Sequence, residues 1–339
     1  IAIAGTLTDS GHPLLLINPH TSFYFRGEVH MVSEEGLNAY GAVTWGQFFI
    51  YQGFNEHTGW MHTSTYADFM DSYLEDVVAQ DGQLFYRYGD KLRPLRVADV
   101  HLDYRDGDTI RTRRFPTYHT HHGPIVGETG GRWMATRINW DPVTALSQSW
   151  LRTRQTGLEG FRQVMESRSN SSNNTVYADS SGNIAYFHGN FMPRRNPAFD
   201  YSQPVDGSNP DTDWQGLHSL DEMIIIENPD SGWIQNANST PFTAAGDSSP
   251  DPDDYPAYMA PDAETFRGVH AARLLQDIAS DGEETFSMAE LLALAHHPAL
   301  PAFEVLLPPL VAHYTNQRSS YPELADAIAA LDAWDTTVS

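Results

Sequence analysis

A strand-length apolar run ends at a side chain that could do chemistry. Residues 13–17 read Pro-Leu-Leu-Leu-Ile, and Asn18, Pro19 and His20 follow directly. Such a run is typical of a buried strand, which would carry the next polar residue to the edge of a core. His20 is therefore a candidate site residue. A core histidine bonded to backbone is the alternative that the sequence leaves open.

A second candidate is the asparagine pair in Asn236-Ala237-Asn238. Residues at i and i+2 lie on one side of an extended segment. An asparagine amide is a neutral donor that can hold an oxyanion. Asparagine clusters are also common in turns, so both interpretations stay open at this point.

Two groups of residues could hold a metal ion. Asp68 and Asp71 are three residues apart and could clamp a hard cation, which prefers oxygen ligands, although solvated carboxylates are the alternative. His119 and His121 would share one face of a strand, as two ligands of a metal must. Because Gly123-Pro124 follows and no carboxylate lies nearby in the sequence, we favour a partly exposed strand end for these histidines.

The elements that would position these residues are mostly strands in the first two-thirds of the chain. Turn signals bound strand-length runs at residues 14–17, 42–51, 97–104 and 109–115. Asp81-Gly82 and Asp106-Gly107 are typical hairpin turns. Residues 176–187, with a turn at 180–183, predict a third hairpin, and the apolar spacing of residues 158–167 predicts a helix.

The last third of the chain has a different pattern. Residues 195–262 are irregular and rich in Pro, Asp, Ser, Asn and Gly. Ser287 and Glu290 have the spacing of a capping box ahead of a helix, and residues 323–334 predict another helix. Residues 1–262 are thus expected to be mainly β and residues 263–339 mainly helical. Strands followed by segregated helices predict the α+β class.

Composition excludes several classes of function. The chain has 44 acidic and 20 basic side chains, a formal charge of −24, which argues against nucleic acid or an anionic membrane as partner. It contains no cysteine, so thiol chemistry is absent. No apolar run approaches the ~20 residues of a membrane span. GxSxG, GxGxxG, GxxxxGK[ST] and HExxH patterns are all missing, and we expect no organic cofactor.

Taken in order, a series of segments resembles the penicillin acylase family of N-terminal nucleophile (Ntn) hydrolases, which includes acyl-homoserine lactone and lipopeptide acylases. The segments include residues 15–20, 36–41, 59–64, 122–124, 177–186, 192–194 and 232–241. The resemblance implies a four-layer αββα sandwich. It also implies that residues 1–339 form the N-terminal part of the family's longer β chain.

The resemblance implies hydrolysis of a linear amide. In the family the nucleophile is a serine that becomes the N-terminus of the β chain by self-cleavage, and here it would lie just upstream of Ile1. Its α-amine would serve as the base. By matched position His20 would orient that amine, the Ser64 backbone N–H and the Asn238 side chain would hold the oxyanion, and Arg267 would support Asn238.

Further residues are matched to binding roles by the same resemblance. Thr21, Gln52 and Asn173 match substrate-binding positions where relatives often carry apolar groups, which favours a smaller or more polar acyl group. A structural Ca²⁺ site is implied at Asp68, Met70, Asp71 and Asp206. The implied partners are an α chain from the same precursor, the rest of the β chain and a small-molecule N-acyl substrate. The implied location is periplasmic or secreted.

Two alternative functions remain. A catalytically inactive relative could keep the fold as a binding or assembly subunit, and the residues that precede Ile1 would distinguish it. A cation-binding extracellular module would explain the acidic loops, and it would show metal-dependent folding without amide turnover.

Overall fold

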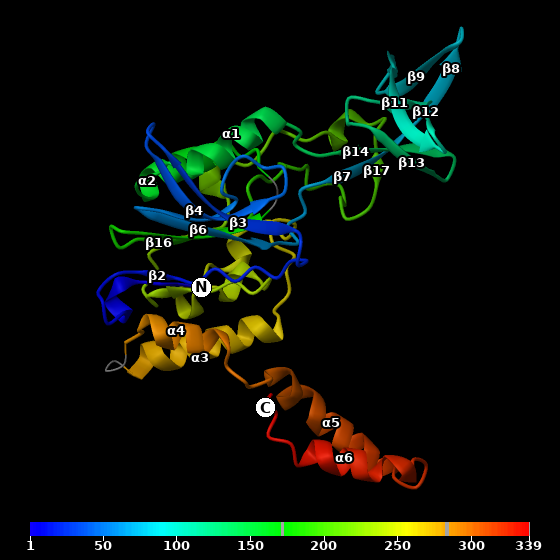
Figure 1. Ribbon diagram of the computed structural model, residues 1–339. Coiled ribbons are helices and arrows are strands. Elements are labelled where there is room, and N and C mark those ends of the chain that lie inside the picture. Colours follow the sequence, from blue (N-terminus) through cyan, green and yellow to red (C-terminus); the bar gives the residue numbers. More distant parts are fainter. Residues whose placement is uncertain (171–172, 282–284, 339) are drawn as a thin grey trace.

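The computed structural model describes residues 1–170, 173–281 and 285–338, and its centre is a four-layer sandwich (Figure 1). Two β-sheets form the inner layers. Helices α1 (Pro142–Arg152) and α2 (Leu158–Met165) cover one sheet, and α3 (Phe266–Asp281) and α4 (Met288–Ala295) cover the other. This arrangement is the αββα form of the α+β class that the sequence predicts.

The larger inner sheet has seven antiparallel strands in the order β18-β16-β15-β6-β5-β4-β3. Their bounds are β3 (Arg26–Ser33), β4 (Leu37–Thr44), β5 (Gln52–Asn55), β6 (Thr58–Ser64), β15 (Asn173–Asp179), β16 (Ile184–Phe187) and β18 (Ile225–Glu227). The smaller sheet has the order β19-β1-β2, with β1 (Ala2–Ile3), β2 (Leu14–Leu15) and β19 (Trp233–Ile234).

Three apolar layers hold the sandwich together. In β15, Val176 packs between the two sheets, whereas Tyr177 packs with Phe161 of α2 on the outer face of the larger sheet. Successive residues of a strand point to opposite faces, so Val176 and Tyr177 pack into different layers. The third layer places Trp233 of the smaller sheet against Leu275 of α3.

An arm of strands extends from one side of the sandwich (Figure 1). It contains a four-stranded sheet in the order β13-β14-β7-β17, in which β17 runs parallel to β7, a three-stranded sheet β10-β9-β8 and the ribbon β11-β12. The bounds are β7 (Asp71–Glu75), β8 (Val77–Gln80), β9 (Gln83–Tyr88), β10 (Lys91–Pro94), β11 (Arg96–Asp106), β12 (Thr109–His119), β13 (Ile125–Thr129), β14 (Arg132–Arg137) and β17 (Val205–Asp206).

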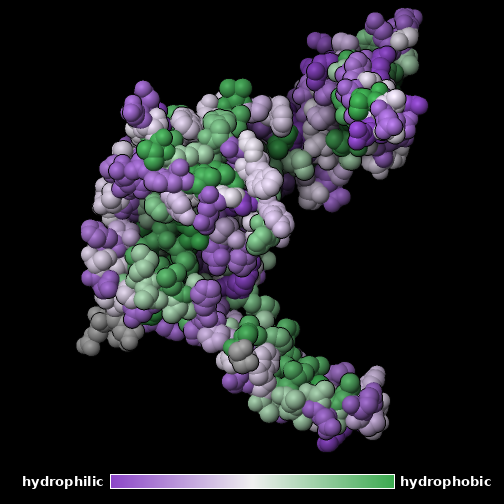
Figure 2. Space-filling view, viewed as in Figure 1, coloured by the Kyte–Doolittle hydropathy of each residue, from purple (hydrophilic) through white to green (hydrophobic). Residues whose placement is uncertain are grey.

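Two further helices, α5 (Pro301–Gln317) and α6 (Ala325–Asp332), lie beyond α3 and α4 (Figure 1). Apolar side chains gather on the surface of this pair (Figure 2). Three of them on α5, Val305, Leu306 and Leu310, are exposed. None of the helices in the described part of the chain is long and apolar enough to cross a membrane.

Most predicted elements are confirmed, and two details are wrong. Residues 97–104 and 109–115 lie within β11 and β12, residues 158–165 form α2, and the Ser287 capping box opens α4. Residues 42–51 are not one strand, because β4 ends at Thr44 and Gly46 adopts a φ of 89°. Helix α1 has no counterpart in the prediction, although its Asp141 cap followed by Pro142 is a helix-start signal.

Candidate active site

A cavity of about 340 Å³ opens where the two inner sheets meet the first turn of α3. Its walls come from segments that are far apart in the sequence: the chain start, the segment after β2, the ends of β3 and β6, the start of β15 and the loop after β19. They are lined by Ile1, Leu16, Asn18, Pro19, His20, Thr21, Arg26, Tyr51, Met61, His62, Thr63, Ser64, Asn173, Gln235, Asn236, Ala237, Asn238, Arg267, His270, Ala271 and Ala295.

All four residues matched to catalytic roles line this one cavity. His20 follows β2 and is exposed, so it is not a core histidine bonded to backbone. Ser64 is the last residue of β6. Asn238 and Arg267 come from the loop after β19 and from α3. The structure thus brings together residues separated by more than two hundred positions.

Arg267 and Ser64 fix the orientation of the Asn238 amide. Arg267 Nη2 donates to Asn238 Oδ1 over 2.9 Å, and Asn238 Nδ2 donates to the Ser64 carbonyl oxygen over 3.1 Å. An amide nitrogen carries two hydrogens, so one N–H remains for a ligand. A preorganised neutral donor of this kind suits an oxygen that gains negative charge during a reaction.

Asn236 has a different role from Asn238. It is buried, and its Oδ1 accepts hydrogen bonds from Thr63 Oγ1 and from the backbone N–H of Asn238. Its Nδ2 donates to the carbonyl oxygen of Ser239 over 3.1 Å. Asn236 therefore holds the turn, in which Asn238 has a φ of 58°, and Asn238 presents its amide to the cavity.

The first turn of α3 is tied to the same loop. Thr265 Oγ1 donates to the Ala237 carbonyl oxygen over 3.2 Å, and it accepts from the backbone N–H of Gly268. A Cβ at Gly268 would lie 2.6 Å from Ser239 Oγ. This close approach sets Arg267 at hydrogen-bonding distance from Asn238.

Of the three residues matched to substrate binding, two line the cavity. Thr21 and Asn173 do so, whereas Gln52 is buried in β5 outside the lining. The sequence analysis missed Arg26, Tyr51 and His62, which line the cavity. These residues come from three separate strands and loops, so no local pattern connects them. The only signal was the position of His62, two residues before Ser64 on β6.

The residues matched to a metal site are only partly brought together. Arg195 Nη2 lies 2.9 Å from Asp71 Oδ1 and 3.1 Å from Asp68 Oδ1, so one guanidinium binds both carboxylates. Met70 lies between them in sequence and is exposed. Asp206 pairs with Leu74, further along β7, and its carbonyl oxygen accepts from Thr212 Oγ1. The structure therefore groups Asp68 and Asp71 but not Asp206.

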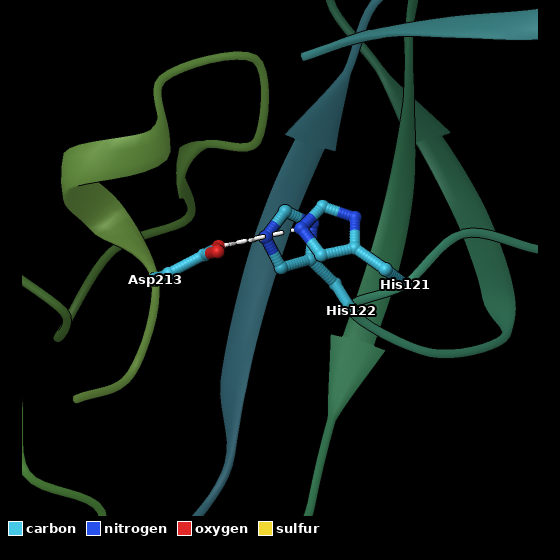
Figure 3. A group of neighbouring side chains, drawn as sticks. All are labelled: His121, His122 and Asp213. Carbon is cyan, nitrogen blue, oxygen red and sulfur yellow. Dashed lines mark hydrogen bonds and ion pairs between the residues drawn. The ribbon is translucent and has the colours of Figure 1, made fainter. Parts of the chain in front are cut away.

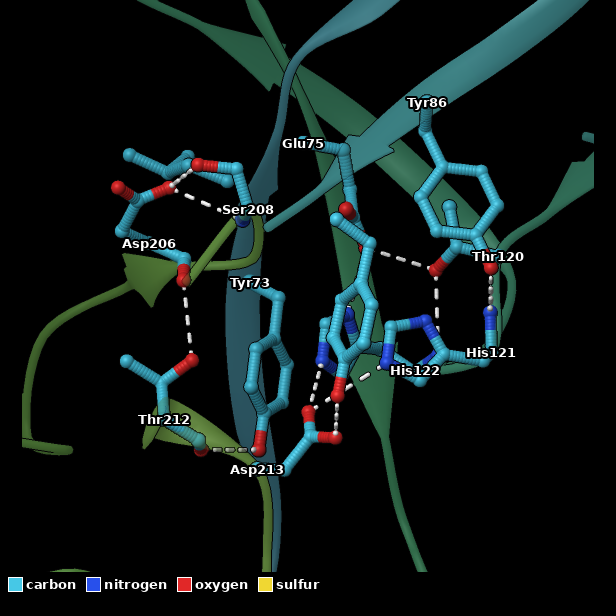
Figure 4. Close-up of polar contacts among 12 residues, drawn as sticks. Tyr73, Glu75, Tyr86, Thr120, His121, His122, Asp206, Ser208, Thr212 and Asp213 are labelled. Carbon is cyan, nitrogen blue, oxygen red and sulfur yellow. Dashed lines mark hydrogen bonds and ion pairs between the residues drawn. The ribbon is translucent and has the colours of Figure 1, made fainter. Parts of the chain in front are cut away.

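A second cluster of possible metal ligands lies in the arm. His121, His122 and Asp213 bring three potential ligand atoms within 4.8 Å of one another (Figure 3). His119 does not belong to the cluster. His122 Nδ1 lies 2.7 Å from Glu75 Oε1 and His122 Nε2 lies 2.8 Å from Asp213 Oδ1 (Figure 4).

Each ring nitrogen of His122 is thus hydrogen-bonded to a different carboxylate. Burial alone would lower the pKa of His122, but hydrogen bonds to Asp213 and Glu75 raise it. Hydrogen bonds from His121, His122 and Tyr88 hold the pKa of Asp213 well below its usual range, against the opposite effect of burial. When the ring is protonated, both nitrogens donate and neither has a lone pair for a metal.

The layered fold and the cavity define the class of protein as an Ntn-hydrolase-like sandwich. The chain belongs to the Penicillin amidase family, whose sequence profile matches residues 1–339. It is similar to the acyl-homoserine lactone acylase QuiP of Pseudomonas fluorescens, with 27% identity over 255 residues, 70% of this chain and 29% of that protein. It is also 26% identical to penicillin G acylase of Escherichia coli over 221 residues, 61% of this chain and 25% of that protein.

A solved structure shares the fold. The thermostable penicillin G acylase from Alcaligenes faecalis matches 99% of this chain and 59% of its own chain, with a TM-score of 0.74 and 19% sequence identity. The chain therefore spans about a quarter to three-fifths of the length of these relatives.

Proposed function

We propose that the protein is an acylase that hydrolyses a linear amide to a carboxylic acid and an amine. The observation that carries the proposal is the Asn238 amide, held by Arg267 and Ser64 with one N–H left for a ligand in the cavity. Membership of the Penicillin amidase family supports it.

The proposed nucleophile is a serine just upstream of Ile1, separated from it by one asparagine. Ile1 lines the cavity, and its backbone nitrogen lies 3.2 Å from the Leu16 carbonyl oxygen. A residue bonded to that nitrogen would therefore begin at the cavity wall, next to the segment that carries His20. This position supports the proposal that a preceding residue reaches the cavity.

The reaction would use the serine and its own α-amino group. The amine, with an ordinary pKa near 8, takes the hydroxyl proton while the oxygen attacks the amide carbon. His20 would orient the amine. Asn238 Nδ2 and the Ser64 N–H would stabilise the oxyanion. The C–N bond then breaks, the leaving amine takes the proton, and water hydrolyses the acyl-enzyme ester.

A structural Ca²⁺ site at Asp68 and Asp71 is a second proposal. Among the described residues, the two carboxylates pair with one guanidinium, that of Arg195, which leaves a formal negative charge. Burial raises the pKa of Asp68, Arg195 opposes this effect, and the nearby Asp71 adds to it. Asp68 and Met70 line a cavity of about 960 Å³. These oxygens fit part of a calcium shell, and Asp206 does not join them.

We further propose that an α chain from the same precursor and the rest of the β chain complete the protein. The fraction of its relatives that this chain spans and the exposed apolar side chains of α5 support this proposal. A periplasmic or secreted location is proposed from the family resemblance. An inactive binding subunit and a cation-binding module remain the competing functions.

The N-terminus of the mature β chain tests the proposal. We expect intact mass and N-terminal sequencing of the protein produced from its full gene to give Ser-Asn before Ile1. A panel of N-acyl amides should be hydrolysed by that protein. A continuous upstream chain without Ser, Thr or Cys at that position would support the inactive relative instead.

A further inference from the structure

Three side chains in the arm direct possible ligand atoms at a common point (Figure 3). His121 Nε2 lies 3.4 Å from Asp213 Oδ1, and His122 Nε2 lies 2.8 Å from the same oxygen. Ligands at about 2.0–2.2 Å from a tetrahedral zinc ion are about 3.3–3.6 Å apart. The first separation already fits such an ion, and the second would have to open by only about half an ångström.

The buried member of the cluster, His122, is oriented by a second carboxylate. Its Nδ1 lies 2.7 Å from Glu75 Oε1, and neither side chain is exposed. Thr120 Oγ1 donates to the same Glu75 oxygen, and the Tyr73 ring stacks on the imidazole with centroids 3.7 Å apart (Figure 4). Histidines that bind metals usually donate their other ring N–H to a carboxylate in this way, which leaves the opposite nitrogen free for the metal.

The two other members are also held in place, but nearer the surface. The Tyr88 hydroxyl donates to Asp213 Oδ2 over 2.6 Å, which leaves Oδ1 directed at the two histidines. The His121 ring lies within 12° of parallel to the Tyr86 ring and edge-on to the Tyr88 ring. The side chains of His121 and Asp213 are 24% and 27% exposed, so an ion can enter and water can complete its coordination.

The charge of this cluster is not balanced by lysine or arginine. In the part of the chain that the structure describes, its two carboxylates, Glu75 and Asp213, form ion pairs only with histidines. By contrast, Asp76 and Asp206 of the same arm both pair with Arg132. With neutral imidazoles the cluster keeps two negative charges, which a divalent cation would neutralise.

We propose that His121, His122 and Asp213 bind a zinc ion, with water in the fourth position. Two imidazole nitrogens and one carboxylate oxygen suit zinc, whereas calcium prefers a shell of six to eight oxygens. Zinc takes the place of the proton on His122 Nε2, so a ring that donates from both nitrogens belongs to the metal-free protein.

The ion joins two segments that are far apart in the sequence. His121 and His122 lie between β12 and β13, and Asp213 follows β17. None of the three lines the cavity that holds Asn238, so the role of the ion is to stabilise the arm rather than to take part in hydrolysis. The inference therefore depends neither on the proposed acylase activity nor on the proposed Ca²⁺ site.

Zinc binding to the mature, untagged protein tests the inference. After EDTA treatment and removal of the chelator, a titration should show a zinc site, and zinc should raise the melting temperature. His121→Gln should weaken zinc binding by about 100-fold or more, because loss of a residue that only supports a ligand already costs about 10- to 100-fold. His119→Gln, which changes a nearby histidine outside the cluster, is the matched control and should leave the affinity unchanged.

Cobalt gives a readout that requires no variant. Co²⁺ in a tetrahedral site has visible absorption bands that are far weaker for six-coordinate Co²⁺. We expect the wild-type protein to show these bands with Co²⁺ and zinc to abolish them. Absence of the bands, or equal zinc affinity in wild type and His121→Gln, would overturn the inference. A zinc effect on the melting temperature that disappears in Asp68→Asn would also overturn it, because the ion would then bind at the proposed Ca²⁺ site.

Discussion

Asn238 combines a backbone role with a chemical one. Its φ of 58° lies in the left-handed region, which asparagine tolerates better than most residues with a Cβ. The same turn directs its amide to the Ser64 carbonyl and to Arg267. One residue type therefore satisfies the turn and supplies the donor, and substitutions can separate the two roles.

We expect Asn238→Ala to lower kcat by about 100- to 1,000-fold, because one oxyanion donor is lost. The alanine should also lower the melting temperature, since the left-handed backbone costs it roughly 1 kcal/mol. Asn238→Gly should recover the melting temperature and stay equally inactive. Steady-state kinetics and thermal melts on fully processed protein measure both effects.

Asn38→Ala, which changes a half-buried residue of β4 whose side chain contacts His30, is the matched control and should keep full activity. Near wild-type kcat in Asn238→Gly would show that the amide is not the oxyanion donor. Loss of activity only in an Asn236 variant that still folds would move the role to Asn236.

At the residue scale, the sequence was informative where a matched segment carried a polar residue. His20, Ser64, Asn238 and Arg267 were predicted in this way, and the structure places them around one cavity. Arg26 was not predicted, because its place in the cavity depends on how distant segments of the chain pack together.

At the element scale, several contacts hold the joint between β12 and β13 in the arm. The ring of His122 stacks on Tyr73 with centroids 3.7 Å apart, and both nitrogens are hydrogen-bonded to carboxylates (Figure 4). Glu75 belongs to β7 and Asp213 to the segment after β17. The ring therefore joins three parts of the arm.

The stability that His122 provides should depend on pH. Its pKa in the folded protein is raised, so its contribution is fully present below its unfolded pKa of about 6.5 and is lost as pH rises through the folded value. The melting-temperature gap between wild type and His122→Gln should be widest near pH 5.5 and should narrow as pH rises through the raised pKa of His122. Thermal melts across this range measure the gap, with His101→Gln on β11 as control.

A gap that stays constant with pH would mean that the ring acts only through packing. At lower pH the His122–Asp213 pair weakens for a different reason, namely protonation of Asp213. The pKa of Asp213 is held low, so its contribution is present above the ordinary carboxylate pKa of about 3.9 and is lost as pH falls further.

Gly123 follows His122 directly and has no room for a side chain. Its φ is 148°, and a Cβ would lie 2.0 Å from the Thr136 carbonyl oxygen. We expect Gly123→Ala to destabilise the protein by roughly 3 kcal/mol or more, since both strain and a backbone clash arise. Gly107→Ala is the matched control: it also has a positive φ, of 62°, but nothing lies within 4 Å.

The control substitution should cost about 1 kcal/mol, from backbone strain alone. Denaturant titrations give both values. Equal costs for the two variants would show that the segment at Gly123 moves away from β14 without penalty.

The sequence predicted strands best where residues typical of a tight turn join them. Asp81-Gly82 joins β8 to β9 with positive φ at both residues, as its hairpin pattern indicated. The run at residues 42–51 was misread because its apolar residues continue past Gly46, where the chain leaves the sheet. Phe49 and Ile50 lie in a loop and are buried there, which strand propensity alone cannot show.

At the scale of the whole molecule, the order of the predicted strands and helices indicated only the α+β class, and the resemblance supplied the layer order. Neither predicted how the arm is attached to the sandwich. That attachment passes through Arg195, whose guanidinium binds Asp68 and Asp71 and lies 4.8 Å from the ring centre of Tyr258. Residues from the β6–β7 segment, from the irregular region and from the loop before α3 meet at this point, and such long-range contacts have no local sequence pattern.

This junction is where the proposed Ca²⁺ should act. An ion bound only by the folded state stabilises it by mass action, so the melting temperature of the mature protein should rise with Ca²⁺ and fall after EDTA treatment. Asp68→Asn should remove that dependence, because the carboxylate beside the cavity is lost. Asp200→Asn, which alters an exposed carboxylate at the same cavity that caps Ser202, is the matched control and should keep it.

Metal analysis of the purified protein accompanies the melts. Because the junction lies outside the cavity that holds Asn238, chelation should lower stability more than it lowers kcat at temperatures where the protein stays folded. Absence of bound calcium together with an unchanged melting temperature would leave Asp68 and Asp71 as partners of Arg195 alone. In that case the single guanidinium would be sufficient to hold the arm on the sandwich, and Arg195→Met should then lower the melting temperature to the same extent with and without Ca²⁺.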